Sequence, residues 1–522
     1  MADRKYLTAP DPKQKSFPSG IPFIIGNELA ERFSFYGMKA ILTVFMTEHL
    51  LTKAGESDYL SDEQAKVWYH AFSGLAYTFP ILGAILADAF WGKYKTILFI
   101  SMMYCLGHGM LALMDLGPHF GLWDMKPFLL AGLIMIAIGA GGIKPCVSAH
   151  VGDQFGTGNK HLLMQIFNWF YFSINVGAAA SSFLTPILLA KYGPWLAFGL
   201  PGVLMALATF IFWLGRNNFV HVPAAGWTKF KEETFSPDGK RALKNLAPLF
   251  LLFVPVFWAI FDQTGSAWVL QAESLNRDFL GITWYKSQIQ VVNPILILTG
   301  IPFFTYVVYP LTAKIFEPTP LRKIGFGFIF TALSFGLSAL IETWITAKSG
   351  SVISGLWAQI GQAGDAPAKL AEVIQIARDS GMTQEQIQPF LTNMPNISWQ
   401  FLAYFILTAG EIMVSIVCLE FAYTQSPKKM KSFIMGIFFL GVALGNYLTM
   451  GVNAVLEKLK DAEGNPPLDA ASYYLFFAGL MIATTIVYAI WTKTYKGDTY
   501  IQGEEDLETI GAEAEAEGTE AR

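Results

Sequence analysis

Long apolar segments alternate with short polar ones along nearly the whole chain. A helix needs about 20 mostly apolar residues to cross a hydrocarbon core of about 30 Å, and by that measure twelve segments qualify. They begin near Ile21, Val67, Thr96, Pro127, Leu162, Pro194, Leu246, Ser287, Leu321, Trp399, Ser432 and Tyr473. The pattern predicts an all-α integral membrane protein with twelve transmembrane helices.

One polar segment divides these helices into two groups of six. Residues 216–245 are polar and basic, and we interpret them as a cytoplasmic linker between an N-terminal bundle, 21–215, and a C-terminal bundle, 246–496. Within the second bundle, residues 347–398 mix Gly, Ala, Gln and acidic residues, with a weak helical period at 366–378. This predicts a small helical insert between the ninth and tenth helices.

Both ends of the chain are polar. Residues 1–20 carry Arg4, Lys5, Lys13 and Lys15 and lack the apolar core of a signal peptide, so we expect an uncleaved cytoplasmic tail. Residues 497–522 are acidic and rich in Gly and Ala, a composition that cannot bury a core. Disorder is expected there.

Basic residues predict the orientation, because cytoplasmic loops keep an excess of Lys and Arg. With both termini in the cytoplasm, roughly 22 of the 36 basic residues lie inside and roughly 11 outside. Short loops at 93–95, 314–323 and 428–431 contribute to this bias. We therefore expect a multi-pass protein of the cytoplasmic (inner or plasma) membrane, with its insert on the periplasmic or extracellular side.

Composition supports a lipid bilayer as the surroundings. The chain is 53% apolar and 15% charged, with a mean hydropathy of +0.41, too apolar for a soluble enzyme of this length. The net charge of −4 includes no basic block, so we expect no nucleic-acid partner. Cys105, Cys146 and Cys418 lie in apolar segments without CxxC spacing and are interpreted as packing residues.

Ionisable residues inside a span are costly and usually face a cavity or the bundle interior. The first helix carries Glu28, Glu31, Arg32, Tyr36 and Lys39. At 100° per residue, all but Glu31 fall within about 80° of one another. The alternative is a Glu28–Arg32 pair that only neutralises itself.

The fourth helix carries Lys144 in a glycine-rich segment, Gly139-Ala-Gly-Gly-Ile-Lys-Pro145. Lys144 lies at a depth similar to that of Glu28 and Glu31, so a carboxylate of the first helix is its expected partner. The glycines let another backbone approach closely. The alternative is a lysine that snorkels to the inner headgroups.

The second half contributes acids. Asp262 on the seventh helix lies at the height of Lys39, so the two can pair, and His70 on the second helix lies at a comparable depth and becomes a candidate proton site. Glu411 on the tenth helix lacks a local counter-charge. Asn175 and Asn293 lie near mid-depth, where hydrogen bonds between helices are the alternative to ligand binding.

Several motifs resemble those of one known family. Glu28-Leu-Ala-Glu-Arg-Phe-Ser-Phe-Tyr-Gly37 resembles the ExxERFxYYG motif of proton-dependent oligopeptide (POT/PTR) transporters in the major facilitator superfamily. Phe170-Tyr-Phe-Ser-Ile-Asn-Val-Gly177 is similar to that family's FYxxINxG signature. Segments 83–107, 257–271 and 411–427 also resemble the family, so the resemblance covers nearly the whole chain.

The resemblance implies two six-helix bundles around a central cavity that opens alternately to each side, and import of di- and tripeptides coupled to protons. It also implies roles for single residues. Arg32, Tyr36 and Lys144 would hold the peptide carboxylate; Asn175, Asn293 and Glu411 the amino group; Glu28, Glu31, His70 and Asp262 would handle protons; and Lys39 with Asp262 would form an outer gate.

Some positions depart from the family pattern and leave side-chain preference open. Phe35 replaces a tyrosine, Lys39 stands where arginine is frequent, and Ala178-Ala179 replaces Ser-Leu. A transporter of nitrate or another small anion and a proton-driven drug exporter are the alternatives. No HExxH, GxSxG or His/Cys cluster is present, so we expect no enzyme, no metal site and no cofactor beyond protons as coupling ion.

Overall fold

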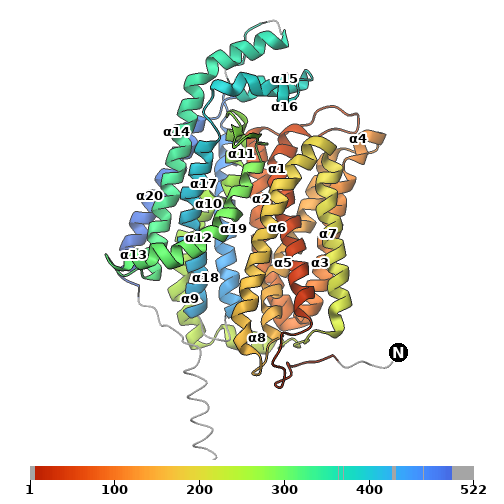
Figure 1. Ribbon diagram of the computed structural model, residues 1–522, viewed down its shortest axis with the longest axis vertical. Coiled ribbons are helices and arrows are strands. Elements are labelled where there is room, and N and C mark those ends of the chain that lie inside the picture. The colour runs from red at the N-terminus through yellow and green to blue at the C-terminus, as the bar shows by residue number, and fades with distance from the viewer. Residues whose placement is uncertain (1–5, 362–363, 368, 426–430, 463, 496–522) are drawn as a thin grey trace, which may run out of the picture.

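The computed structural model describes residues 6–361, 364–367, 369–425, 431–462 and 464–495. Its long helices run side by side in two groups (Figure 1). The predicted acidic tail, 497–522, lies outside the described residues, as do Lys428 and Lys429.

The N-terminal half contains six long helices. They are α1 (Ile21–Glu48), α2 (Asp62–Ile85), α3 (Lys93–Leu113), α5 (Met125–Asp153), α6 (Leu163–Tyr192) and α7 (Pro194–Leu214). A single turn of π-helix, Leu86–Trp91, extends α2, and the short helix α4 (Leu116–Phe120) joins α3 to α5.

Several spans of the C-terminal half consist of consecutive segments. The seventh comprises α9 (Pro237–Pro248), α10 (Val254–Phe261) and α11 (Ala267–Glu273); the eighth, α12 (Val292–Phe303) and α13 (Tyr309–Ala313); the tenth, α17 (Ser398–Glu411) and α18 (Val417–Thr424). The remaining spans are α14 (Pro320–Ile360), α19 (Lys431–Lys458) and α20 (Ala470–Thr492). A two-stranded hairpin, β1 (Asp278–Phe279) and β2 (Ile282–Thr283), lies between α11 and α12.

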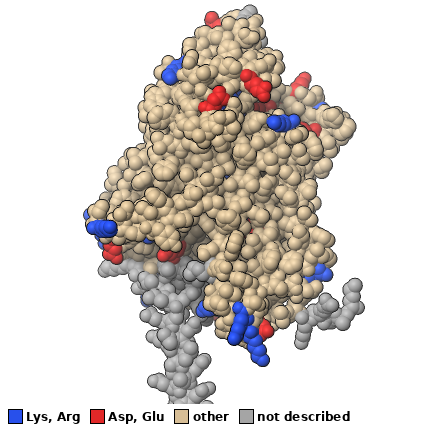
Figure 2. All heavy atoms as spheres, in the orientation of Figure 1, with Lys and Arg blue, Asp and Glu red and all other residues tan. Residues whose placement is uncertain are grey.

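Within the described residues, eleven helices are long and apolar enough to cross a membrane, and α1 is the twelfth long helix. Glu28, Glu31, Arg32 and Lys39 interrupt the apolar run of α1. On the face shown in Figure 2, charged side chains lie mostly toward the two ends of the molecule. The predicted twelve-helix membrane fold is confirmed.

Two helices extend past the segments predicted to cross the membrane. The helix of the seventh span begins at Pro237, before the predicted start near Leu246, because the polar linker itself forms helix α8 (Trp227–Thr234) and most of α9. Residues 347–360 belong to α14 and not to a loop. With 41 residues, α14 is about 60 Å long and extends well past a hydrocarbon core of about 30 Å.

The helical insert begins where α14 ends. It contains α15 (Leu370–Asp379) and α16 (Gln384–Ile387), followed by a 3-10 segment, Gln388–Asn393. These elements lie over one end of the bundles, opposite α8 (Figure 1). We call these two ends the insert side and the linker side.

Each half has its own apolar core. The core of the first half contains buried residues from α1 to α7 and a single residue of the second half, Val269 of α11. The halves meet where α2 packs along α19 and α6 along α12. Glycines allow close packing within the first half: a methyl group at Gly83 of α2 would clash with the carbonyl of Gly142 on α5.

The seventh span is broken in the membrane. A 3-10 turn, Asp262–Gly265, separates α10 from α11, and Ser266 has non-helical dihedral angles (φ −126°, ψ −86°). Free backbone carbonyls at such a break need partners. Thr43 of α1 donates its hydroxyl to the carbonyl of Gly265 over 2.7 Å, which ties the break to the other half.

Candidate functional site

A cavity of about 210 Å³ lies between the two halves. Six of the residues singled out in the sequence line it: Tyr36, Lys39, Asn175, Asp262, Asn293 and Glu411. They come from α1 and α6 on one side and from the seventh, eighth and tenth spans on the other. The fold therefore brings together residues that are far apart in the chain.

The second half contributes a carboxylate without a cation. Asn293 donates its amide to Glu411 Oε2 over 2.5 Å and to the Thr408 hydroxyl over 3.1 Å. The described part of the chain shows no ion pair to Glu411. On the opposite wall, Asn175 donates to the carbonyl of Tyr171 over 3.0 Å. Its carbonyl oxygen remains available as an acceptor.

On α1, Arg32 contacts both glutamates of the motif. Its Nε donates to Glu28 Oε1 over 2.7 Å and lies 3.3 Å from Glu31 Oε2. The side chains of Glu28 and Glu31 are almost fully buried, and Arg32 is 12% exposed. The structure thus contains the Glu28–Arg32 pair, and it lies one helical turn from Tyr36 on the cavity wall.

Lys144 does not have the expected carboxylate partner, so that prediction was wrong. Among the described residues its ammonium has no hydrogen-bond acceptor. It lies 3.7 Å from the ring centroid of Phe35 and 4.8 Å from that of Tyr77, within cation–π range. Arg32 takes the hydrogen bond to Glu28, and both oxygens of Glu31 are left without a hydrogen-bond partner among the described residues. Since Tyr77 lines the cavity, Lys144 lies directly behind the wall.

The expected contact between Lys39 and Asp262 is present. Lys39 Nζ lies 2.7 Å from Asp262 Oδ1, and both side chains are 7% exposed. Asn446 of α19 donates to Asp262 Oδ2 over 2.6 Å, and His70 Nδ1 lies 2.8 Å from Asn446 Oδ1. His70 Nε2 lies 2.9 Å from the Ser266 hydroxyl. A chain of hydrogen bonds therefore connects His70 to the ion pair.

Sequence reasoning missed Asn446 and Ser266. Both are polar residues inside predicted spans, as are Asn175 and Asn293, so the same criterion could have found Asn446. The role of Ser266 depends on the break in the seventh span, which the apolar pattern of 246–273 did not indicate.

A sequence profile described as the POT family matches residues 94–235, 227–363 and 368–467. The chain belongs to the POT family. Peptide transporter family 1 of Drosophila melanogaster is 39% identical over 365 residues, which are 62% of this chain and 48% of that protein. Solute carrier family 15 member 2 of Homo sapiens is 35% identical over 366 residues, 63% of this chain and 49% of that protein. The chain thus spans about half the length of these curated POT family relatives.

Solved POT family structures share the fold. The crystal structure of an auto-inhibited POT family peptide transporter is 31% identical, with a TM-score of 0.72 over 93% of this chain and 99% of that one. The POT family transporter PepTSo is 30% identical, with a TM-score of 0.70 over 92% of this chain and 99% of that one. These matches confirm the predicted family and fold.

Proposed function

We propose that this protein is a proton-coupled symporter that imports di- and tripeptides across the cytoplasmic membrane by alternating access. Its relatives are named as peptide transporters. The observation that carries the proposal is the cavity between the halves. Glu411, which has no cation partner among the described residues, lies in one wall, and two cations, Arg32 and Lys144, lie behind the other.

This arrangement suits a short zwitterion. A peptide ammonium would approach Glu411, Asn293 and Asn175, and its carboxylate would approach Tyr36, with Arg32 and Lys144 behind. Fixed charges at the ends of a cavity select by length and leave the side chains free to vary. A small anion such as nitrate has no group for Glu411, which disfavours that alternative.

Coupling would follow from competition for Arg32. Its guanidinium contacts Glu28 and Glu31 in this structure. A peptide carboxylate that takes Arg32 would leave a buried glutamate without its cation, and the neutral, protonated form would then be favoured. Peptide and proton would therefore move together. His70, linked through Asn446 to Asp262, is a second candidate to hold a proton.

Access would alternate about this cavity. Polar contacts between the halves gather on the insert side: Lys39 with Asp262, Lys460 with Glu63, and Gln64 with Glu457. We assign the insert side to the outside and the termini to the cytoplasm, in agreement with the distribution of basic residues. This structure is then closed to the outside, with Lys39 and Asp262 as a gate.

Uptake into proteoliposomes tests the proposal. A one-unit pH step, acidic outside, should drive about tenfold accumulation of a labelled dipeptide for each coupled proton. An N-acetylated dipeptide and a dipeptide amide should compete more weakly than the free dipeptide, since each lacks one charged end. Competition by nitrate equal to that of dipeptide would favour the anion transporter, and proton-driven export of dipeptide or dye would favour the exporter.

A further inference from the structure

The helical insert is attached to the second half by an apolar face. Leu370, Val373, Ile374 and Ala377 of α15 are buried in the core of that half. Their spacing of three and four residues places them on one side of the helix. The insert is therefore packed on the second half and should move with it.

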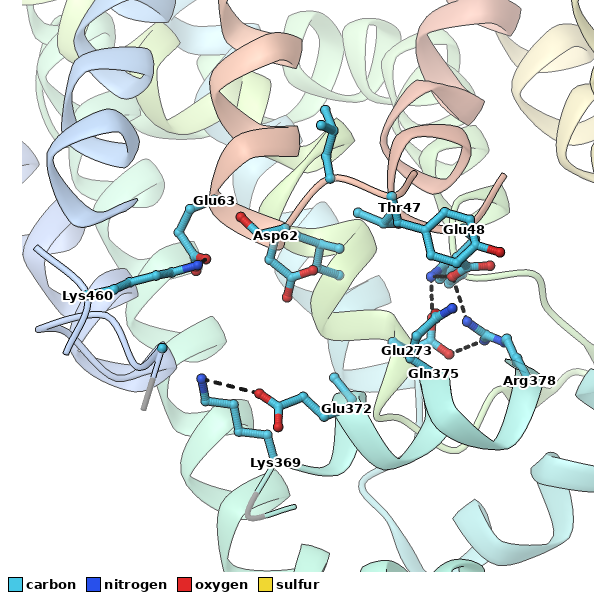
Figure 3. A pocket seen from close by; sticks show the side chains of 17 residues that line it. Thr47, Glu48, Asp62, Glu63, Glu273, Lys369, Glu372, Gln375, Arg378 and Lys460 are labelled. Carbon is cyan, nitrogen blue, oxygen red and sulfur yellow. Dashed lines mark hydrogen bonds and ion pairs between the residues drawn. The ribbon is translucent and has the colours of Figure 1, made fainter. Parts of the chain in front are cut away.

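Arg378, next to the last of these apolar residues, reaches both halves. Its Nη1 donates to Glu48 Oε1 of α1 over 2.6 Å, and its Nη2 contacts Glu273 at the end of α11. Lys286, in the loop before α12, contacts the same two carboxylates. Figure 3 shows Glu48, Glu273 and Arg378 converging beside a cavity of about 290 Å³. We call Glu48, Glu273, Lys286 and Arg378 the insert cluster.

The insert cluster is largely removed from water. Its four side chains are between 6% and 19% exposed. Burial by itself lowers the pKa of Arg378, but the carboxylates of Glu273 and Glu48 outweigh it and raise the pKa above its ordinary value. Arg378 therefore stays charged.

The four residues are distributed unevenly between the moving parts. Only Glu48 belongs to the first half; Glu273 and Lys286 belong to the second, and Arg378 to the insert packed on it. If the halves separated, Glu48 at the end of α1 would be exposed to water. Lys286 and Arg378 would keep their contacts with Glu273. A buried cation left unpaired is strongly destabilising. Separation therefore leaves two cations, Lys286 and Arg378, with one carboxylate, and this imbalance opposes opening.

We infer that the insert is a latch on the outer gate, in which Arg378 stabilises the closed insert side by contacting Glu48 across the two halves. This inference rests on the proposed transport cycle. Lys39, which pairs with Asp262, lies nine residues before Glu48 on α1. This second contact is therefore about 13 Å farther from the insert along the helix axis. Opening to the outside would then require both contacts to break, the one between Arg378 and Glu48 and the one between Lys39 and Asp262. A transporter without the latch would spend more time open to the outside.

Cysteine labelling in detergent tests the latch without relying on transport. Val269 is fully buried in the core of the other half, so a cysteine there reacts with a maleimide when the halves separate. In a Val269→Cys background, Arg378→Gln should raise the labelling rate at least about fivefold, and Arg378→Lys should raise it less. The matched control is Lys369→Gln, which removes an exposed pair with Glu372 on the same helix and should change nothing.

A double-mutant cycle separates the latch from general loosening of the fold. In a Glu48→Gln background, Arg378→Gln should add little, because the ion pair between the halves is already lost. Unchanged labelling in Arg378→Gln, or an equal rise in Lys369→Gln, would overturn the latch. Proteoliposome uptake would still report separately on the proposed function.

Discussion

The two ends of α1 carry the same kinds of side chain but use them differently. Toward the linker side, Arg32 contacts Glu28 and Glu31 of its own helix. Toward the insert side, Lys39 and Glu48 contact the other half and the insert. A pair within one helix keeps its geometry when the bundles move, whereas a pair between bundles must break. In the proposed transport cycle, the first group would therefore respond to substrate and protons, and the second would depend on which side is open.

The largest effect is expected where the first group is broken. Glu28→Gln keeps a hydrogen-bond acceptor for Arg32 but removes the group that would exchange a proton. The variant should catalyse counterflow exchange of dipeptide yet show no accumulation under a one-unit pH step, where the parent reaches about tenfold per coupled proton. Acid-stimulated accumulation equal to that of the parent would remove Glu28 from coupling.

A smaller effect is expected where a contact between the halves is broken. Asp262→Asn leaves Lys39 buried without its carboxylate, and loss of one partner of a buried pair costs about 3–5 kcal/mol. The closed insert side should be weakened, so maleimide labelling of Val269→Cys should rise and thermal stability should fall. Adding Lys39→Gln should restore most of the thermal stability, because no unpaired charge is left, whereas labelling should stay raised because the gate pair is still absent.

If the double variant were as labile as Asp262→Asn alone, the unpaired charge of Lys39 would not be the source of the effect. Asn446 would then be the next residue to test, since its amide donates to the same carboxylate.

The smallest effect is expected at a buried acid that takes no part in either group. Glu342 of α14 is 8% exposed and accepts from the amide of Gln271 over 3.0 Å, and the described residues offer it no cation within ion-pair distance. Glu342→Gln keeps a side-chain oxygen that accepts the hydrogen bond from Gln271, and it leaves no cation without a partner. The free energy of unfolding should therefore change by less than about 1 kcal/mol. Thermal unfolding and uptake measure this, and a loss of uptake would give Glu342 a role in transport.

Much of the fold could be predicted because a bilayer imposes strong rules on sequence. Apolar runs of the required length marked nearly all the helices, and the long polar segment marked the division into two halves. The exceptions have a common cause. Polar residues at 237–245 and at 347–360 continue helices beyond the bilayer, where hydropathy no longer distinguishes helix from loop.

The candidate site could be predicted less completely. Charged residues within spans identified Lys39 and Asp262 as neighbours, because their depths could be counted along each helix. Lys144 was assigned the wrong partner, since two cations were available for the same two glutamates and sequence does not show which is nearer. Asn446 and Ser266 were missed because their function depends on a broken helix and on a neighbour from another span.

The sequence by itself determined that the protein lies in a lipid bilayer, how many helices span it and which family motifs they carry. It also gave the depth of each buried charge along its helix. These features depend on local composition and on the fixed rise of a helix. Only the tertiary structure decided which charges meet: Arg32 rather than Lys144 with the glutamates, and Arg378 of the insert with Glu48 of α1. The surroundings of Lys144 and the pairing of Arg378 with Glu48 depend on how helices rotate and pack against one another, and no single segment carries that information.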